Sequence, residues 1–93
     1  MTNERFASVW DALEGEAAEA ENMKLRSSLM RALQDRIKAT PMTQAEAAKL
    51  FGVTQPRISD LMRGKIQLFG IDTLVAMLAT AGLHVEMRIA EAA

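Results

Sequence analysis

Signals that start and stop helices crowd together between Thr43 and Gly64, and they constrain the fold more than any other part of the sequence. Thr43 followed three residues later by Glu46 is the pattern of a capping box, in which two side chains satisfy the free backbone N–H groups at a helix start. Gly52 then supplies a residue that easily adopts the positive φ of a helix end. This part of the stretch therefore predicts a short helix.

A second helix is predicted directly after that glycine. Thr54 can cap its start, and Pro56 lies in its first turn, where a missing backbone N–H breaks no hydrogen bond. Gly64 is placed as the glycine that ends it. The spacing therefore predicts two short helices joined by a tight turn.

The residues expected where these two helices pack against each other are small or apolar. Ala48 is small where the helices must approach closely, and Gly52 follows four residues later in the turn. Such packing fixes the angle between the helices, so we predict a helix-turn-helix from Gln44 to Gly64. The alternative is a plain helical hairpin that packs and binds nothing. The residues expected in the shared core are Ala47, Leu50, Phe51, Val53, Ile58 and Leu61.

The second helix of the pair has a polar face suited to reading DNA. Ile58 and Leu61 define its buried side, because successive residues are turned by about 100° around a helix. A glutamine can bond an adenine edge twice, a serine reads donors or acceptors, and an aspartate can accept from cytosine N4. Arg57 lies at the flank, better placed for the DNA backbone than for bases. The side chains expected to point outward are Gln55, Pro56, Ser59, Asp60 and Arg63.

The charges divide the chain into an acidic start and a basic centre. The net charge is −1, yet residues 1–23 carry one basic residue against six acidic ones, and residues 24–65 carry nine basic residues against three. The basic centre favours contact with phosphates, although charged faces are also simply solvated. The acidic start, with Phe6 and Trp10 as apolar anchors, would suit a basic partner. The alternative is that Trp10 covers the core.

The composition excludes other classes of site. There is no cysteine and only one histidine, His84, so no thiolate or multi-histidine metal site is available and we expect no cofactor. The sequence lacks a phosphate-binding glycine loop and paired carboxylates, so we expect no catalytic residues. No run approaches the roughly 20 apolar residues that span a bilayer. We expect a cytoplasmic protein that is neither an enzyme nor a membrane protein.

Three further helices are predicted outside the motif. A short one follows a cap at Ser8 and ends near Gly15. The longest runs from Glu16 to Lys38 and stops before Pro41, since a proline pushes the preceding residue out of the helical region. The last runs from Ile71 to Ala81. Their expected apolar faces are Phe6, Val9, Trp10 and Leu13; Leu25, Leu29, Leu33 and Ile37; and Leu74, Val75 and Leu78.

From Leu83 to Ile89, apolar and polar residues alternate with the period of a half-buried strand. No other segment has this period, so we expect the strand to pair with its own copy across a two-fold axis. A frayed tail is the alternative. The whole pattern predicts a mainly α fold of five helices with a C-terminal β-strand. The expected dimerisation residues are Leu83, Val85, Met87 and Ile89.

The run from Thr43 to Gly64 resembles the helix-turn-helix of the Xre/Cro/C1 repressor family. The resemblance implies a lambda-repressor-like domain in which Gln44 braces a DNA phosphate and the second motif helix reads bases. Pro56 departs from the polar residue more usual at its position. We therefore predict a sequence-specific repressor. Its DNA-binding residues would be Thr43, Gln44, Thr54, Gln55, Pro56, Arg57, Ser59, Asp60, Arg63 and Lys65.

Nearly the whole chain is similar to small Xre-type antitoxins of the HigA kind. That resemblance implies a homodimer that represses its own operon at a palindromic operator in double-stranded DNA, with a RelE/ParE-like toxin as partner. We expect an N-terminal segment with a short helix (1–15), a helix-turn-helix domain (16–82) and a C-terminal dimerisation strand and tail (83–93). The alternatives are a phage-type repressor without a toxin and a protein-interaction module that retains the helix-turn-helix scaffold.

Overall fold

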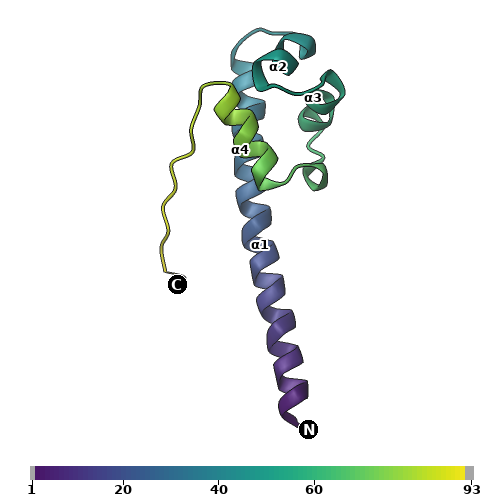
Figure 1. Cartoon of the computed structure of the whole chain (residues 1–93), viewed down its shortest axis with the longest axis vertical. Coiled ribbons are helices and arrows are strands. Elements are labelled where there is room, and N and C mark those ends of the chain that lie inside the picture. Colours follow the sequence, from purple (N-terminus) through teal and green to yellow (C-terminus); the bar gives the residue numbers. More distant parts are fainter. Residues whose placement is uncertain (1, 92–93) are drawn as a thin grey trace.

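A computed structural model describes the backbone of residues 2–91 and the side chains of residues 15–91. These residues form α1 (Thr2–Ala39), α2 (Gln44–Phe51), α3 (Gln55–Met62), the 3-10 turn η1 (Ile66–Leu68) and α4 (Ile71–Thr80). Figure 1 shows the three shorter α-helices grouped around the C-terminal half of α1, while its N-terminal half extends away from them. The molecule is consequently long, measuring 60 × 27 × 17 Å along its principal axes.

The two helices predicted on either side of Gly15 are one continuous helix, so the prediction of five helices is wrong. A glycine inside a helix costs about 1 kcal/mol relative to alanine, which is too little to break a helix between strong helix formers. Here Leu13 and Glu14 precede the glycine, and Glu16 and Ala17 follow it. The predicted stop before Pro41 is confirmed, because α1 ends at Ala39. The side-chain roles predicted for Phe6, Val9, Trp10 and Leu13 lie outside the described side chains.

The hydrophobic core lies where the C-terminal half of α1 meets the three shorter helices. Leu33 and Ile37 are buried there as predicted, whereas Leu25 is 44% exposed. Leu50 and Val75, also predicted inward, lie on the exposed sides of α2 and α4. The buried side of α2 includes Ala48 instead, and the buried side of α4 includes Met77. The buried residues are Met30, Leu33, Ile37, Ala47, Ala48, Phe51, Ile58, Leu61, Phe69, Leu74, Met77 and Leu78.

The predicted C-terminal β-strand is not formed by the described residues. The Leu83 N–H donates to the carbonyl of Leu78 at 2.9 Å, and residues 84–91 continue as an extended segment without ladder partners. Figure 1 shows this segment returning alongside α4 and α1. The alternation predicted an extended backbone, but a strand also needs a neighbour whose N–H and C=O groups complete its hydrogen bonds. No described part of the chain supplies one.

None of the helices in the described residues combines the length and apolar character needed to cross a membrane. The longest, α1, carries charged side chains along its whole length, including Glu16, Glu19, Lys24 and Arg31.

Candidate nucleic-acid interface

The start of α2 is held by the capping box that the sequence predicts. The Glu46 N–H donates to the Thr43 hydroxyl oxygen at 3.1 Å, and the Thr43 N–H donates to Glu46 Oε1 at 3.1 Å. The bonds from the backbone and hydroxyl of Thr43, with a smaller attraction from Lys49, lower the pKa of the Glu46 carboxyl. Reciprocal caps of this kind fix where a helix begins and in which direction it points.

The turn between α2 and α3 depends on a glycine. Gly52 has a φ of 69°, in the left-handed region, and the Val53 N–H donates to the carbonyl of Ala48 at 2.9 Å. A Cβ atom on this glycine would lie 3.1 Å from Cγ2 of Thr80, at the end of α4. The turn is therefore closed both by its own backbone and by α4 packed over it.

The second helix of the motif, α3, has one buried side and one open side. Thr54 caps it by accepting from the Arg57 N–H at 3.4 Å, and Pro56 lies in its first turn. Ile58 and Leu61 have no exposed surface, as predicted. The opposite side of the helix therefore faces away from the core.

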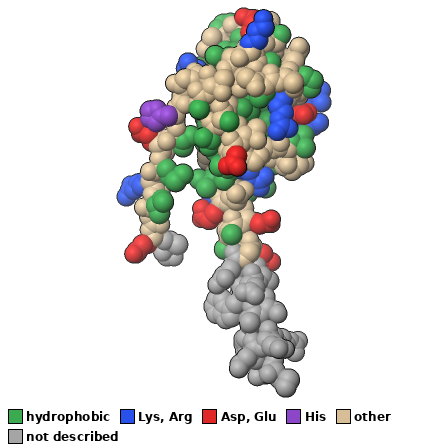
Figure 2. All heavy atoms as spheres, in the orientation of Figure 1, with side chains coloured by type: hydrophobic (Ala, Val, Ile, Leu, Met, Phe, Trp, Pro, Cys, Tyr) green, Lys and Arg blue, Asp and Glu red, His purple; other side chains and the backbone are tan. Residues whose placement is uncertain are grey.

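The predicted DNA-binding residues gather on the caps, the outer side of α3 and the turn after it. The half-buried members among them are Arg57, Ser59 and Asp60. Figure 2 shows lysine and arginine side chains spread over the part of the molecule that carries α3. The exposed members of the set are Thr43, Gln44, Thr54, Gln55, Pro56, Arg63 and Lys65.

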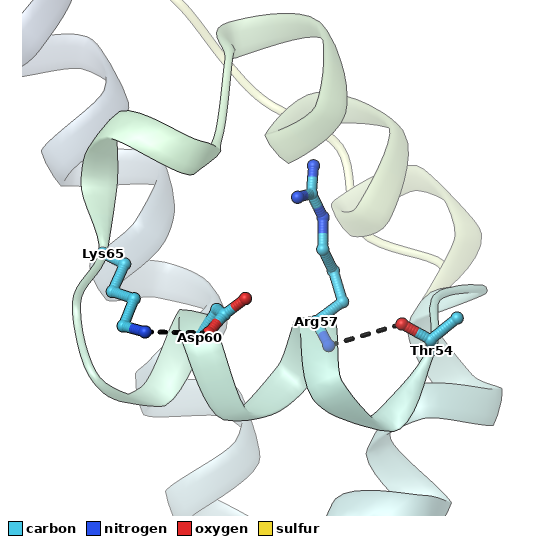
Figure 3. A network of polar contacts seen from close by, with 4 residues as sticks. All are labelled: Thr54, Arg57, Asp60 and Lys65. Carbon is cyan, nitrogen blue, oxygen red and sulfur yellow. Dashed lines mark hydrogen bonds and ion pairs between the residues drawn. The ribbon is translucent and has the colours of Figure 1, made fainter.

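Two charged members of this set have partners that the sequence pattern does not reveal. Lys65 Nζ lies 3.3 Å from Asp60 Oδ1, across the turn that follows α3, and Figure 3 shows the two side chains pointing toward each other. Gly64, at a φ of 72°, reverses the chain there, and the Lys65 N–H donates to the carbonyl of Asp60 at 3.1 Å. The carboxylate on the reading helix is thus paired with a nearby ammonium group.

Arg57 extends away from α3 rather than along its outer side (Figure 3). Its guanidinium carbon lies 4.5 Å from the centre of the ring of Phe69, a fully buried residue. This geometry is a cation–π contact, which holds the arginine against the protein. The sequence pattern assigned no role to Phe69, and the contact links α3 to the segment between η1 and α4.

Two long-range contacts from α1 were also missed by the sequence reasoning. Gln34 Nε2 donates to the carbonyl of Leu61 at 2.8 Å, and Arg26 Nη1 donates to the carbonyl of Ile66 at 3.4 Å. Both are formed between residues far apart in the chain, and a backbone carbonyl leaves no signal in the residue type that carries it. No pattern within one helix could therefore have predicted them.

The described residues contain no group of three His, Cys, Asp or Glu side chains that could hold a metal ion. The polar groups of the motif are helix caps, hydrogen-bonding side chains and basic side chains. Such a set is able to bond base edges and phosphate oxygens.

Comparisons with known proteins agree with this geometry. A family described as a helix-turn-helix domain matches residues 13–90. A solved structure assigned to the XRE family of transcriptional regulators matches with a TM-score of 0.71 and 30% sequence identity, covering 80% of this chain and 83% of its own. No curated protein matches the chain. The chain belongs to the Xre-type helix-turn-helix family of DNA-binding transcriptional regulators.

Proposed function

We propose that this protein is a sequence-specific repressor that inserts α3 into the major groove of double-stranded DNA. The observation that carries the proposal is the division of α3 into a core side, with Ile58 and Leu61 fully buried, and an outer side that includes exposed Gln55. An α-helix with this division fits the major groove, where base pairs present distinct donors and acceptors. The family provides the DNA-binding activity, and the outer side of α3 provides the reading residues.

Within this proposal, Gln55 at the start of α3 bonds an adenine edge, and Ser59 one turn later bonds a neighbouring base. Asp60 accepts from cytosine N4 once Lys65 has moved from it to a phosphate. The paired state of the free protein, with 3.3 Å between the two charged groups, keeps the carboxylate from repelling DNA during approach.

Phosphate contacts come from the edges of the motif. The N-terminus of α2 presents the backbone N–H groups of Gln44 and Ala45, which favour anions. At the start of α3, beside the exposed Thr54, only the Gln55 N–H is available, because Pro56 has none and the Arg57 N–H bonds Thr54. Arg63 and Lys65 add positive charge after α3. Arg57 supports this surface from behind, since its guanidinium is occupied over Phe69.

The test is selection of binding sites from a random pool of duplexes. Gln55→Ala should lose about 1–3 kcal/mol at one base position. Lys65→Ala should instead weaken all sequences alike and reduce the dependence of affinity on salt concentration. An unchanged sequence preference in Gln55→Ala would contradict this placement of α3. A binding constant independent of salt would favour the alternative, a protein-interaction module.

The repressor acts as a homodimer in this proposal, because two recognition helices can then read two halves of a palindrome about 34 Å apart. A groove of about 240 Å³ offers the surface for a second copy. Its walls come from α1, α4 and the C-terminal segment, and Figure 2 shows hydrophobic side chains gathered there. The apolar residues that line it are Leu25, Leu29, Ile71, Val75, Val85 and Met87.

This face is suited to contact with its own copy. Leu25, Val75 and Met87 all line the groove, and Met87 is the most exposed of the three, at 70%. Two-fold symmetry would place Met87 of each copy against the apolar groove of the other. Glu86 and Arg88, which also line the groove, have opposite charges, so Glu86 of one copy can meet Arg88 of the other. Leu83 and Ile89 continue the apolar contact at its two ends.

Met87→Lys tests the dimer, because it places a charge in the groove without disturbing the core. We expect a monomer by sedimentation equilibrium, with weaker binding to a full palindrome. Met23→Lys is the matched control, since Met23 is also exposed but does not line the groove. A Met87→Lys variant that remains dimeric would contradict the proposed interface.

The biological setting we propose is autoregulation by an antitoxin, with a basic RelE/ParE-like toxin bound to the acidic half of α1. Residues 1–23 supply the negative charge, and residues 15–25 are exposed on the described surface. A protein encoded next to this gene, if basic, should copurify with the full chain. Deletion of residues 1–15 should abolish that copurification while leaving DNA binding intact; retention of the partner would count against this setting and leave a repressor without a toxin.

A further inference from the structure

A side chain of α1 forms a hydrogen bond with the backbone at the C-terminal end of α3. Gln34, a half-buried residue in the packed half of α1, donates from Nε2 to the main-chain oxygen of Leu61 at 2.8 Å. That oxygen also accepts from the Gly64 N–H at 3.0 Å. The last carbonyls of a helix have no partner within the helix, so such an oxygen is free to take an external donor.

The other end of α3 is fixed independently. The turn around Gly52 holds it through the bond from the Val53 N–H to the carbonyl of Ala48 at 2.9 Å. Ile58 and Leu61 pack α3 against the core between its ends, and a hydrogen bond at its far end adds a directional restraint. With Gln34 bonded to Leu61, the direction of α3 relative to the rest of the domain is constrained at both ends.

A second donor from α1 acts on the chain just beyond α3. Arg26 Nη1 donates to the carbonyl of Ile66 in η1, at 3.4 Å. The two donors thus hold the chain on both sides of Gly64, where it reverses direction. Both reach backbone oxygens, so they fix the path of the backbone whatever side chains α3 presents to DNA.

We propose that Gln34 is a positioning residue that sets the direction of α3 and so controls discrimination between DNA sequences. The inference rests on the proposed function, in which α3 reads bases. Direct reading requires side chains placed within roughly 0.5 Å and 10–20° of the productive geometry, whereas phosphate contacts tolerate more. Loss of the Gln34 bond therefore reduces specific binding more than non-specific binding.

Two variants remove the donor. Gln34→Met has a similar length and no N–H group, and Gln34→Glu has a similar shape but a carboxylate that cannot donate at neutral pH. Gln34→Lys restores a donor on a side chain long enough to reach Leu61. Asn22→Met is the control, because it replaces an exposed amide on the same helix, far from α3.

The measurement is the ratio of dissociation constants for a scrambled duplex and for a duplex that the wild-type protein selects from a random pool. It is made well below the melting temperature of each variant, so that every variant is folded. Gln34→Met and Gln34→Glu should lower the ratio about three- to tenfold, the effect of one net hydrogen bond. Gln34→Lys should retain most of the ratio, and Asn22→Met all of it.

The outcomes separate this inference from the proposed function. If Gln34→Met and Gln34→Glu melt at lower temperature but keep the wild-type ratio, the bond serves stability alone and the inference is overturned. A Gln34→Lys ratio as low as that of Gln34→Met would overturn it as well. A wild-type ratio near one would overturn sequence-specific reading by α3, and this inference with it.

Discussion

The two halves of α1 have the same secondary structure and opposite surroundings. Residues 15–25 are exposed on every side, whereas Met30, Leu33 and Ile37 in the second half are buried in the core shared with the shorter helices. Both halves are rich in good helix formers, mainly alanine and glutamate up to residue 25 and leucine, arginine and alanine from residue 26 on. Helix propensity is therefore shared by residues 15–25 and residues 26–39, and Met30, Leu33 and Ile37, spaced along one helix face, give the second segment its packed side.

The comparison separates two sources of helix stability. The packed half gains most of its stability from tertiary contacts, as helices in globular proteins generally do. The exposed part of α1, residues 15–25, is called the bare half below. It continues a helix that is already nucleated, so it adds hydrogen bonds without the free-energy cost of nucleating a new helix. Among its described side chains, Glu21 and Lys24 form an ion pair at 4.0 Å, which is solvent-exposed and contributes little.

The largest expected difference between the halves comes from truncating an apolar side chain in each. Leu33→Ala should lower the free energy of unfolding by about 2–5 kcal/mol, because it leaves a cavity in the core. Met23→Ala, in the bare half, should change it by less than about 0.5 kcal/mol. Urea denaturation measures both. Equal losses would mean that the bare half is packed in solution against something else.

The next effect concerns a glycine in the packed part. Gly52→Ala should destabilise the protein by about 1–2 kcal/mol, because a left-handed conformation is unfavourable for residues with a Cβ atom. The new Cβ would also press on Thr80, 3.1 Å away. Thermal melting followed by circular dichroism gives the loss. An unchanged melting temperature would show that this turn can relax.

A glycine in the bare half should respond with the opposite sign. A Cβ on Gly15 would meet no described atom within 4 Å outside the helix's own backbone, so Gly15→Ala introduces no clash with the described residues. Alanine favours the helix by about 1 kcal/mol over glycine, and that gain stays local. Amide hydrogen exchange should slow around residue 15 while the global free energy of unfolding barely changes. Slower exchange throughout the domain would mean that the two halves unfold together.

The smallest effect is the pH dependence of the α2 cap. The pKa of Glu46 is lowered in the folded protein, so its contribution is complete above its ordinary pKa of 4.5 and is lost as the pH falls through the lowered value. Glu46→Gln keeps a hydrogen-bond acceptor but does not titrate. The difference in urea midpoint between the two proteins should shrink as the pH falls through this range. A difference that stays constant into acid would assign no role to the carboxylate charge.

Local signals predicted the motif well, because its helix ends are determined by neighbouring residues. The capping box at Thr43, the left-handed Gly52 and the buried pair Ile58 and Leu61 are all confirmed. Each depends on a residue type at a short, fixed spacing. The family resemblance of the motif is confirmed by the comparisons, whereas the identity of the bases that α3 contacts stays a prediction.

The predictions were wrong where the structure depends on contacts between residues distant in sequence or on small differences in free energy. Gly15 looked like a helix end, but a glycine inside a helix costs only about 1 kcal/mol, which is too little to break α1. The alternation after Leu83 described an extended backbone and not its missing hydrogen-bond partner. The bond from Gln34 to Leu61 joins two helices through a carbonyl oxygen, which every residue carries. The direction of α3 could therefore not be predicted from residue types alone.

The length of α1 has a consequence for the hydrodynamics of the protein. A compact domain of this size has a radius of gyration of about 12 Å, and this chain has 17.3 Å. At the same molecular mass, an elongated particle experiences more friction in solution than a compact one. The elution volume of one chain on a gel-filtration column would therefore correspond to a heavier sphere. Static light scattering measures the molar mass of the particle regardless of its shape, so it gives the number of chains directly.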